Sequence, residues 1–134
     1  MIYHIIEKSN FLSRVNGDQY LPAGFEETGF VHCALEESVI AVANDYFVNC
    51  KDTLLLLRID PAKLRAQTKY EAAAPLPGAG NSHVQASPEF PHVYGPIELS
   101  AIEGVGVMET GIGGYGWPAD FHPPEYFFKN IFDT

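Results

Sequence analysis

Three histidines, His4, His32 and His92, stand on or beside predicted β-strands. Each has apolar neighbours that would exclude water, and an imidazole in such a setting can transfer protons near neutral pH. If the three side chains converge, they could also ligate zinc and leave a fourth position for water. The sequence contains no H-x-H or H-x-x-x-H pair, so the spacing does not favour a metal, and we expect none. Taken singly, each histidine can equally be a buried imidazole bonded to a backbone carbonyl.

Other catalytic and phosphate-binding patterns are absent or incomplete in this sequence. No G-x-S-x-G turn is present, which disfavours a serine hydrolase. Cys33 follows His32 directly in a predicted strand, so the two side chains point to opposite faces and cannot form a dyad. The GAGNS segment at residues 78–82 has neither the lysine nor the preceding strand of a phosphate-binding loop. The histidines therefore remain the main chemical lead.

Two short β-rich segments carry the first two histidines. The run Ile2–Ile6 predicts a core strand with His4 on the same face as its first and last residues. The run Phe30–Ala34 predicts a second strand, with His32 on the face opposite its two immediate neighbours. Residues 36–47 predict a helix, because two glutamates open it and apolar residues recur at helical spacing.

The remaining segments predict an α+β domain around one central strand. The run Thr53–Ile59 is almost continuously apolar, which is typical of a strand covered on both faces. Around it we predict a short helix over 10–15, helical turns over 61–66, a short strand over 68–71 and one or two strands over 97–108. Gly104 and Gly106 would allow a bulge or a close approach in the last of these. The segment 72–89, which contains His83, has little periodicity and is a candidate lid.

Composition limits the partners. The chain has 134 residues, a formal net charge of −9 and an isoelectric point near 4.8. Only eight residues are Lys or Arg, so we expect neither nucleic acid nor an anionic membrane as a partner. No apolar run has the length of a membrane span, and the N-terminus has no apolar signal segment. We therefore expect a cytoplasmic protein in which Cys33 and Cys50 are reduced.

The C-terminal residues 109–134 differ in composition from residues 1–108, which we predict to form a single domain. Glycines and a proline come first, and the aromatic residues that follow are Trp117, Phe121, Tyr126, Phe127, Phe128 and Phe132. So many aromatic residues are not typical of a disordered tail. We expect a C-terminal aromatic arm that docks on the domain or on a second copy of it, which would give a homodimer.

Three motifs carry a resemblance to known families: IYHI at Ile2–Ile5, GFVHCA at Gly29–Ala34 and FPHVYGPI at Phe90–Ile97. As a set they resemble the small bacterial family known as domain of unknown function nine-five-two, over roughly residues 1–108. The same blocks are more distantly similar to the core of the ADP-ribosyltransferase superfamily. That similarity implies an α+β fold on a split, mixed β-sheet, with short helices packed on it.

The ADP-ribosyltransferase resemblance also implies residue roles, with NAD as a substrate. His4 matches the histidine that holds the NAD ribose and the nicotinamide amide. His32 matches, within one residue, the position whose ring stacks on nicotinamide. Tyr46, at the end of an Ala-Asn-x-Tyr helix segment, and Tyr94 complete the implied cofactor-binding set.

His92 takes the third-motif position of that superfamily, which is usually glutamate. The transition state of ADP-ribosyl transfer carries positive charge on the ribose, and a protonated imidazole would oppose it. A carboxylate would then have to come from Glu71, Glu89 or Glu98.

Three functional hypotheses follow. The first is an NAD-utilising transferase or hydrolase, or a nucleotide-binding relative, in which His4, His32 and His92 line a cleft. The second is a non-catalytic module that binds a nucleotide-like or other small ligand. The third is a metal-dependent hydrolase with a histidine site.

Overall fold

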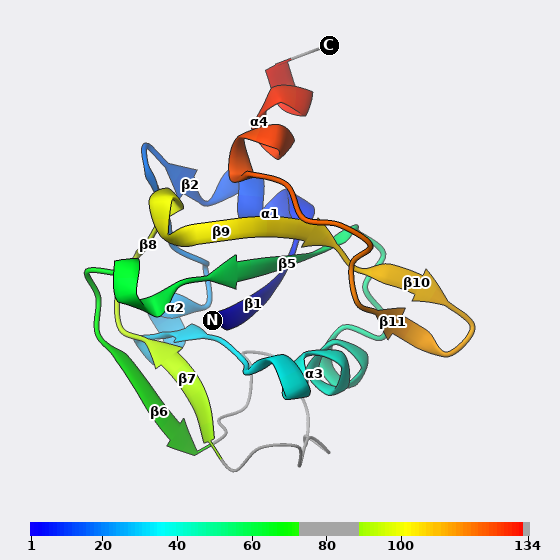
Figure 1. Cartoon of the computed structure of the whole chain (residues 1–134), viewed down its shortest axis with the longest axis horizontal. Coiled ribbons are helices and arrows are strands. Elements are labelled where there is room, and N and C mark those ends of the chain that lie inside the picture. The colour runs from blue at the N-terminus through cyan, green and yellow to red at the C-terminus, as the bar shows by residue number, and fades with distance from the viewer. Residues whose placement is uncertain (73–88, 133–134) are drawn as a thin grey trace.

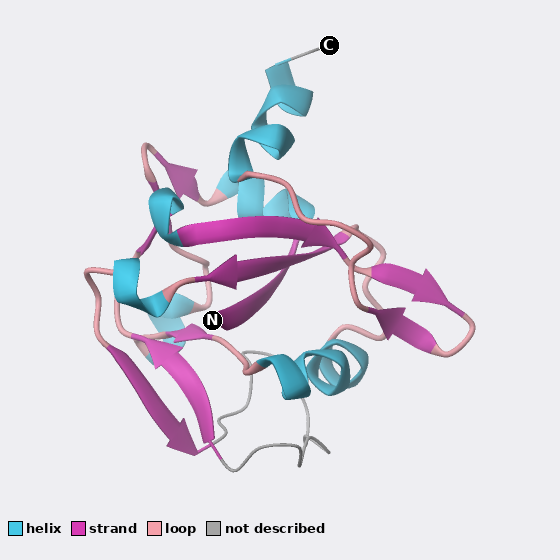
Figure 2. Cartoon of the chain, in the orientation of Figure 1, coloured by secondary structure: helices cyan, strands magenta, loops and turns pink. Residues whose placement is uncertain are grey.

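The computed structural model describes residues 1–72 and 89–132 and shows an α+β fold of short helices and small antiparallel sheets (Figures 1 and 2). In chain order the elements are β1 (Ile2–Glu7), α1 (Lys8–Ser13), β2 (Val15–Asn16), β3 (Gln19–Tyr20), α2 (Phe25–Thr28), β4 (Val31–His32), η1 (Glu36–Ser38), α3 (Val39–Tyr46), β5 (Leu54–Ile59), η2 (Pro61–Lys63), β6 (Thr68–Ala72), β7 (Glu89–Val93), β8 (Ile97–Glu98), η3 (Leu99–Ala101), β9 (Ile102–Val107), β10 (Glu109–Gly111), β11 (Gly114–Gly116) and α4 (Pro124–Phe132). Within these residues the strands form the sheets β1-β5-β9, β2-β3-β8 and β4-β7-β6 and the hairpin β10-β11.

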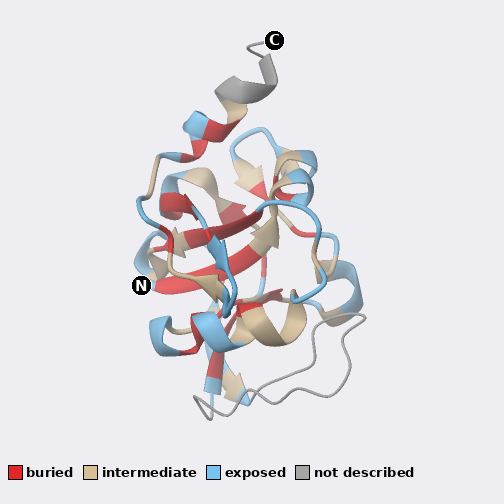
Figure 3. Cartoon of the chain, turned by 90° about the vertical axis from the view of Figure 1, so that its right-hand side faces the viewer, coloured by how far each residue is buried: buried red, intermediate tan, exposed pale blue. Residues whose placement is uncertain are grey.

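The central sheet is organised around β5, as the apolar run predicts. This strand pairs antiparallel with β1 on one side and with β9 on the other. Its side chains alternate between two hydrophobic clusters: Leu55, Leu57 and Ile59 lie in the first, and Leu54 and Leu56 lie in the second. All five are buried, and each buried leucine or isoleucine stabilises the fold by about 1.5–3 kcal/mol. The sheet thus separates two cores, and Figure 3 shows the buried residues along its strands.

The C-terminal arm packs on its own domain across β9. A Cβ atom on Gly106 would lie 2.6 Å from Cβ of Pro118, and one on Gly104 would lie 2.9 Å from Cβ of Phe121. Only residues without a Cβ leave room for the arm there, so the close approach predicted at these glycines is present. Farther along the arm, Phe127 of α4 is buried in the first core cluster. Docking on a second copy stays a prediction.

The β4-β7-β6 sheet is joined to the central sheet through its first strand. Main-chain hydrogen bonds of 2.9 and 2.7 Å link Tyr3 of β1 with Ala34, just after β4. Val31, Cys33 and Val93 point into the first core cluster. Because side chains alternate along a strand, the residues between them face the other way. This sheet therefore has one face on the core and one face on which polar side chains gather.

Some predicted elements are displaced. The helix expected over 10–15 occupies Lys8–Ser13, because β2 and β3 pair as a hairpin around Gly17, whose φ is 65°. The helix expected over 36–47 opens as the short 3-10 turn η1 and continues as α3. The turns expected over 61–66 shorten to η2, with the Asp60 side chain capping the amide of Ala62.

The predicted mixed sheet is wrong, whereas the α+β class is confirmed. Every strand pairing in residues 1–72 and 89–132 is antiparallel. The expectation of parallel pairs came from the superfamily resemblance, and the residue pattern of a strand does not encode the direction of its neighbour. The candidate lid, His83 included, lies outside the described residues apart from its two ends.

In the part of the chain that the structure describes, no helix is both long enough and apolar enough to span a membrane.

Candidate functional site

His32 and His92 lie side by side on one face of the β4-β7-β6 sheet. The two residues are directly opposite each other in the antiparallel pairing of β4 with β7, so both side chains point to the same face. Their ring centroids are 5.8 Å apart. We call this face, which carries His32, Lys69, Glu71, His92 and Tyr94, the polar face. The strand register thus brings together two of the three histidines that the sequence singled out.

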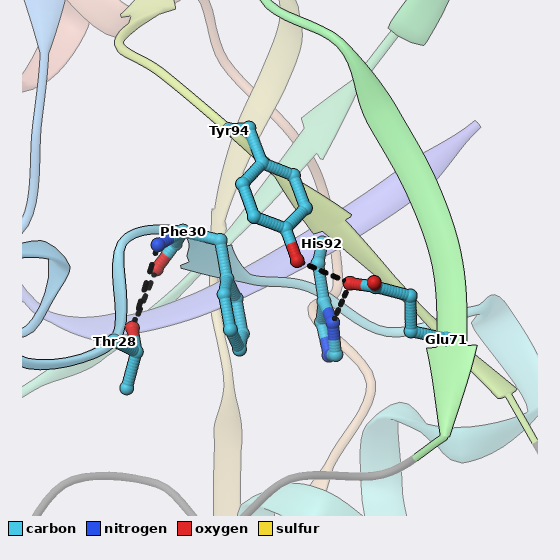
Figure 4. A network of polar contacts seen from close by, with 5 residues as sticks. All are labelled: Thr28, Phe30, Glu71, His92 and Tyr94. Atoms are coloured by element: carbon cyan, nitrogen blue, oxygen red, sulfur yellow. Dashed lines mark hydrogen bonds and ion pairs between the residues drawn. The ribbon is translucent and has the colours of Figure 1, made fainter.

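Phe30 fixes the orientation of His92 on the polar face. Its ring stacks on the His92 imidazole at a centroid distance of 4.0 Å and an interplanar angle of 22° (Figure 4). Two features of the preceding turn place this ring. Gly29 ends α2 with a φ of 83°, which residues with a side chain rarely adopt, and the Thr28 hydroxyl donates a 3.0 Å hydrogen bond to the carbonyl oxygen of Phe30.

Glu71 enters the polar face from β6. It lies opposite Phe90 in the pairing with β7 and therefore on the same side of the sheet as His92. Nδ1 of His92 donates to Oε1 of Glu71 at 2.8 Å, and the Tyr94 hydroxyl donates to the same oxygen at 2.5 Å (Figure 4). The Tyr94 bond, followed by the His92 bond, holds the pKa of Glu71 below its usual value. The carboxylate is therefore charged at neutral pH and fixed by two donors.

The Glu71 carboxylate faces solvent, whereas its partner His92 is buried. The His92 side chain is 3% exposed, whereas that of Glu71 is 39% exposed. The hydrogen bond to Glu71 raises the pKa of Tyr94, so the phenol keeps its proton and remains a donor. The group as a whole connects a buried imidazole to a solvent-facing carboxylate.

Lys69 completes the polar face at its outer strand. It lies directly opposite His92 in the pairing of β6 with β7. Its ammonium is 5.0 Å from the centre of the Tyr94 ring, a geometry in which the ring attracts the cation. The polar face therefore carries a cation and an anion on one strand.

His4 lies in the interior, and both of its ring nitrogens are bonded there. Nδ1 lies 2.7 Å from the carbonyl oxygen of His32, and Nε2 lies 2.7 Å from the hydroxyl of Tyr20. A carbonyl only accepts, so Nδ1 carries the proton and donates, while Nε2 accepts from the hydroxyl. Burial lowers the pKa of His4 to about 4. The structure thus joins His4 to the main chain of β4, and its contact with a ligand stays a prediction.

The Ala-Asn-x-Tyr segment lies in α3. Tyr46 is half-buried and packs on the second core cluster beside Val42 and Phe47. Oδ1 of Asn44 accepts a 2.8 Å hydrogen bond from the amide of Tyr115, which ties α3 to the β10-β11 hairpin. The observed contacts of this segment are structural, and cofactor binding by Tyr46 stays a prediction.

The sequence indicated Glu71 only as one of three residues that could replace the third-motif glutamate. It gave no functional role to Lys69 or Phe30. The missing information is the register of β6 on β7. Once that register is known, alternation along β6 puts both charged residues beside His92. Glu98 is engaged elsewhere, since its carboxylate accepts from the amide of Arg65.

Among the described residues, no group of three or more His, Cys, Asp or Glu side chains is arranged to hold a metal ion.

Comparison with known proteins gives a family and a fold. The model of the family described as "Protein of unknown function (DUF952)" matches residues 5–105, in agreement with the resemblance seen in the three motifs. No curated protein matches the chain significantly. The solved structure of protein CC0527 from Caulobacter crescentus is similar to this chain, with a TM-score of 0.67. The two sequences are 19% identical, and the match covers 95% of this chain and 97% of CC0527. A double mutant of CC0527 is 18% identical with the same TM-score and coverage. Identity this low shows a shared fold alone.

Proposed function

The chain belongs to the DUF952 family, whose description assigns no function, and we propose that its polar face binds NAD and cleaves the nicotinamide glycosidic bond. The observation that carries the proposal is the Glu71 carboxylate, which accepts hydrogen bonds from both His92 and Tyr94. The ADP-ribosyltransferase resemblance calls for a carboxylate near the third-motif position. Glu71 supplies it from the neighbouring strand, and His92 is a positioning residue.

Glu71 acts on the charge that develops as the bond breaks. Nicotinamide leaves ribose C1′ with the bonding electron pair, and the sugar becomes cationic until water or another acceptor bonds to C1′. When water is the acceptor, its proton goes to solvent. A carboxylate fixed in advance beside C1′ lowers the energy of this transition state without having to reorganise. Both donors use Oε1 of Glu71, which leaves Oε2 to face the ligand.

The aromatic groups of the polar face suit the planar base of such a ligand. Phe30 is stacked on His92 and lies 4.7 Å from the His32 ring between centroids. Rings held in this way offer apolar surface for stacking at low cost in side-chain entropy. In this proposal His32 contacts nicotinamide, and His4 acts through the His32 carbonyl, which it holds in place.

The test is nicotinamide release from NAD by the purified full chain. Glu71→Gln keeps the size of the side chain and removes its charge, so we expect turnover to fall about a hundredfold, the scale of losing one preorganised electrostatic contact. Glu103→Gln is the matched control, because Glu103 pairs with Lys63 outside this sheet. Equal turnover by the two variants would contradict the proposal.

A second function is favoured by the exposure of the carboxylate. Glu71 is 39% exposed, and water weakens the field of a charge on a nearby transition state. A non-catalytic module that binds a nucleotide would therefore bind NAD without releasing nicotinamide. Calorimetric titration of NAD into the wild type, together with the release assay, separates the two functions: binding with release supports the first, and binding without release supports the second. The absence of both binding and release would refute both.

A further inference from the structure

Lys69 is the cation of the β4-β7-β6 sheet. It is the only Lys or Arg in the strands Val31–His32, Thr68–Ala72 and Glu89–Val93. Within the described residues it forms no salt bridge, whereas Lys63 is paired with Glu103 at 2.7 Å. Its ammonium lies over the Tyr94 ring. The ammonium also acts electrostatically on the Glu71 carboxylate, but among the described residues it forms no salt bridge with it.

The charges of the polar face have a fixed order along β6. Lys69 and Glu71 are two positions apart and point to the same side, so their Cα atoms lie about 6.6 Å apart at about 3.3 Å per residue. That is the scale of a ribose with its 5′-phosphate. The Glu71 end suits positive charge, and the Lys69 end suits negative charge. A ligand that matches both ends is a nucleotide whose base is cationic and whose sugar carries a phosphate.

We propose that Lys69 is the anion-selecting residue of the site and contacts the phosphate next to the nicotinamide ribose. This inference rests on the proposed function, since it takes Glu71 to face the glycosidic carbon of the same ligand. Lys69 selects the nicotinamide nucleotide over the corresponding nucleoside. The lysine is exposed, so the preference is modest and is weakened by salt.

The test compares nicotinamide mononucleotide with nicotinamide riboside, which differ only by the phosphate. Calorimetric titration at low salt measures both affinities in the wild type, in Lys69→Gln and in the matched control Lys63→Gln. We expect the wild type and Lys63→Gln to prefer the mononucleotide about fivefold, the scale of an exposed ion pair. Lys69→Gln should lose this preference while its affinity for the riboside is unchanged. A preference that survives in Lys69→Gln overturns the inference.

A second probe separates this inference from the proposed function. Pyrophosphate, which has neither base nor sugar, is titrated while the NMR signals of the Tyr94 ring are followed. If neither nicotinamide compound binds, the proposed function fails, and the pyrophosphate result decides the role of Lys69. Shifts of the Tyr94 signals that disappear in Lys69→Gln support an anion site at this lysine. Tyr94 signals that do not respond, or that respond equally in both proteins, overturn it.

Discussion

The buried histidine of β1 makes the stability of the fold depend on pH in a calculable way. Folding lowers the pKa of His4 from 6.5 to about 4, chiefly through burial. The unfolded chain therefore takes up a proton on His4 at a higher pH than the folded chain does. Stability from this residue is complete above pH 6.5 and is lost as the pH falls from there toward 4.

The size of the loss follows from the gap between the two pKa values. Each unit corresponds to about 1.4 kcal/mol, so the folded state loses roughly 3 kcal/mol at pH 4 relative to pH 7 because of His4 alone. That is a large part of the stability of a typical domain, which is about 5–15 kcal/mol. The structural reason is burial, because a protonated His4 ring in the interior would lose the water that stabilises its charge.

The assay is urea unfolding of the wild type and of His4→Gln between pH 7 and pH 4. Glutamine has a donor and an acceptor but does not titrate in this range, so subtracting the two profiles removes the contribution of every other group. We expect the advantage of the wild type to shrink by roughly 3 kcal/mol over this range. A constant difference would refute the reasoning. NMR titration of His4 in the wild type checks the same point without a variant, because a midpoint near pH 6.5 would contradict it.

Two further predictions concern the carboxylate and the arm. Tyr94→Phe removes the hydroxyl that donates to Glu71, so the pKa of Glu71 should rise toward its usual value. An NMR titration that shows no rise would mean that this hydroxyl does not lower the pKa of Glu71. Gly106→Ala places a Cβ 2.6 Å from the arm's proline, which should cost about 1–3 kcal/mol and lower the melting temperature. Gly111→Ala is its control, because nothing lies within 4 Å of the added atom, and equal melting temperatures would count against the packing argument.

Local patterns in the sequence were sufficient for the α+β class and for several individual elements. The apolar run of β5 predicted a central strand because a strand buried on both faces has no room for alternating polar residues. Gly104 and Gly106 predicted either a bulge or a close approach, and the structure shows the close approach of the arm. The β2-β3 hairpin was missed because each strand has only two residues, which is too short to show a period. The direction of strand pairing was also wrong, since it depends on contacts between distant segments.

The candidate site could be predicted only in part, for the same reason. His32 and His92 come from motifs separated by sixty residues, and their meeting depends on the β4-β7 register. Glu71 was visible in the sequence as a carboxylate but could not be placed, because its position beside His92 is a property of the β6-β7 pairing. His4 looked like its two counterparts, yet it faces the core, where burial and two hydrogen bonds account for it.

The hydrogen bond between Glu71 and His92 shows how a carboxylate on a neighbouring strand can reach the position of His92. Residues on adjacent strands that are diagonal neighbours lie about 7–8 Å apart at the backbone, within reach of long side chains. Glu71 reaches His92 in this way, because it is opposite Phe90 rather than opposite His92 itself. A carboxylate on the neighbouring strand can therefore bond to a donor at the motif position and be held beside it. His92 is such a donor. Under the proposed function, a histidine where the ADP-ribosyltransferase resemblance implies glutamate would be compatible with activity, because the partner strand carries the acid.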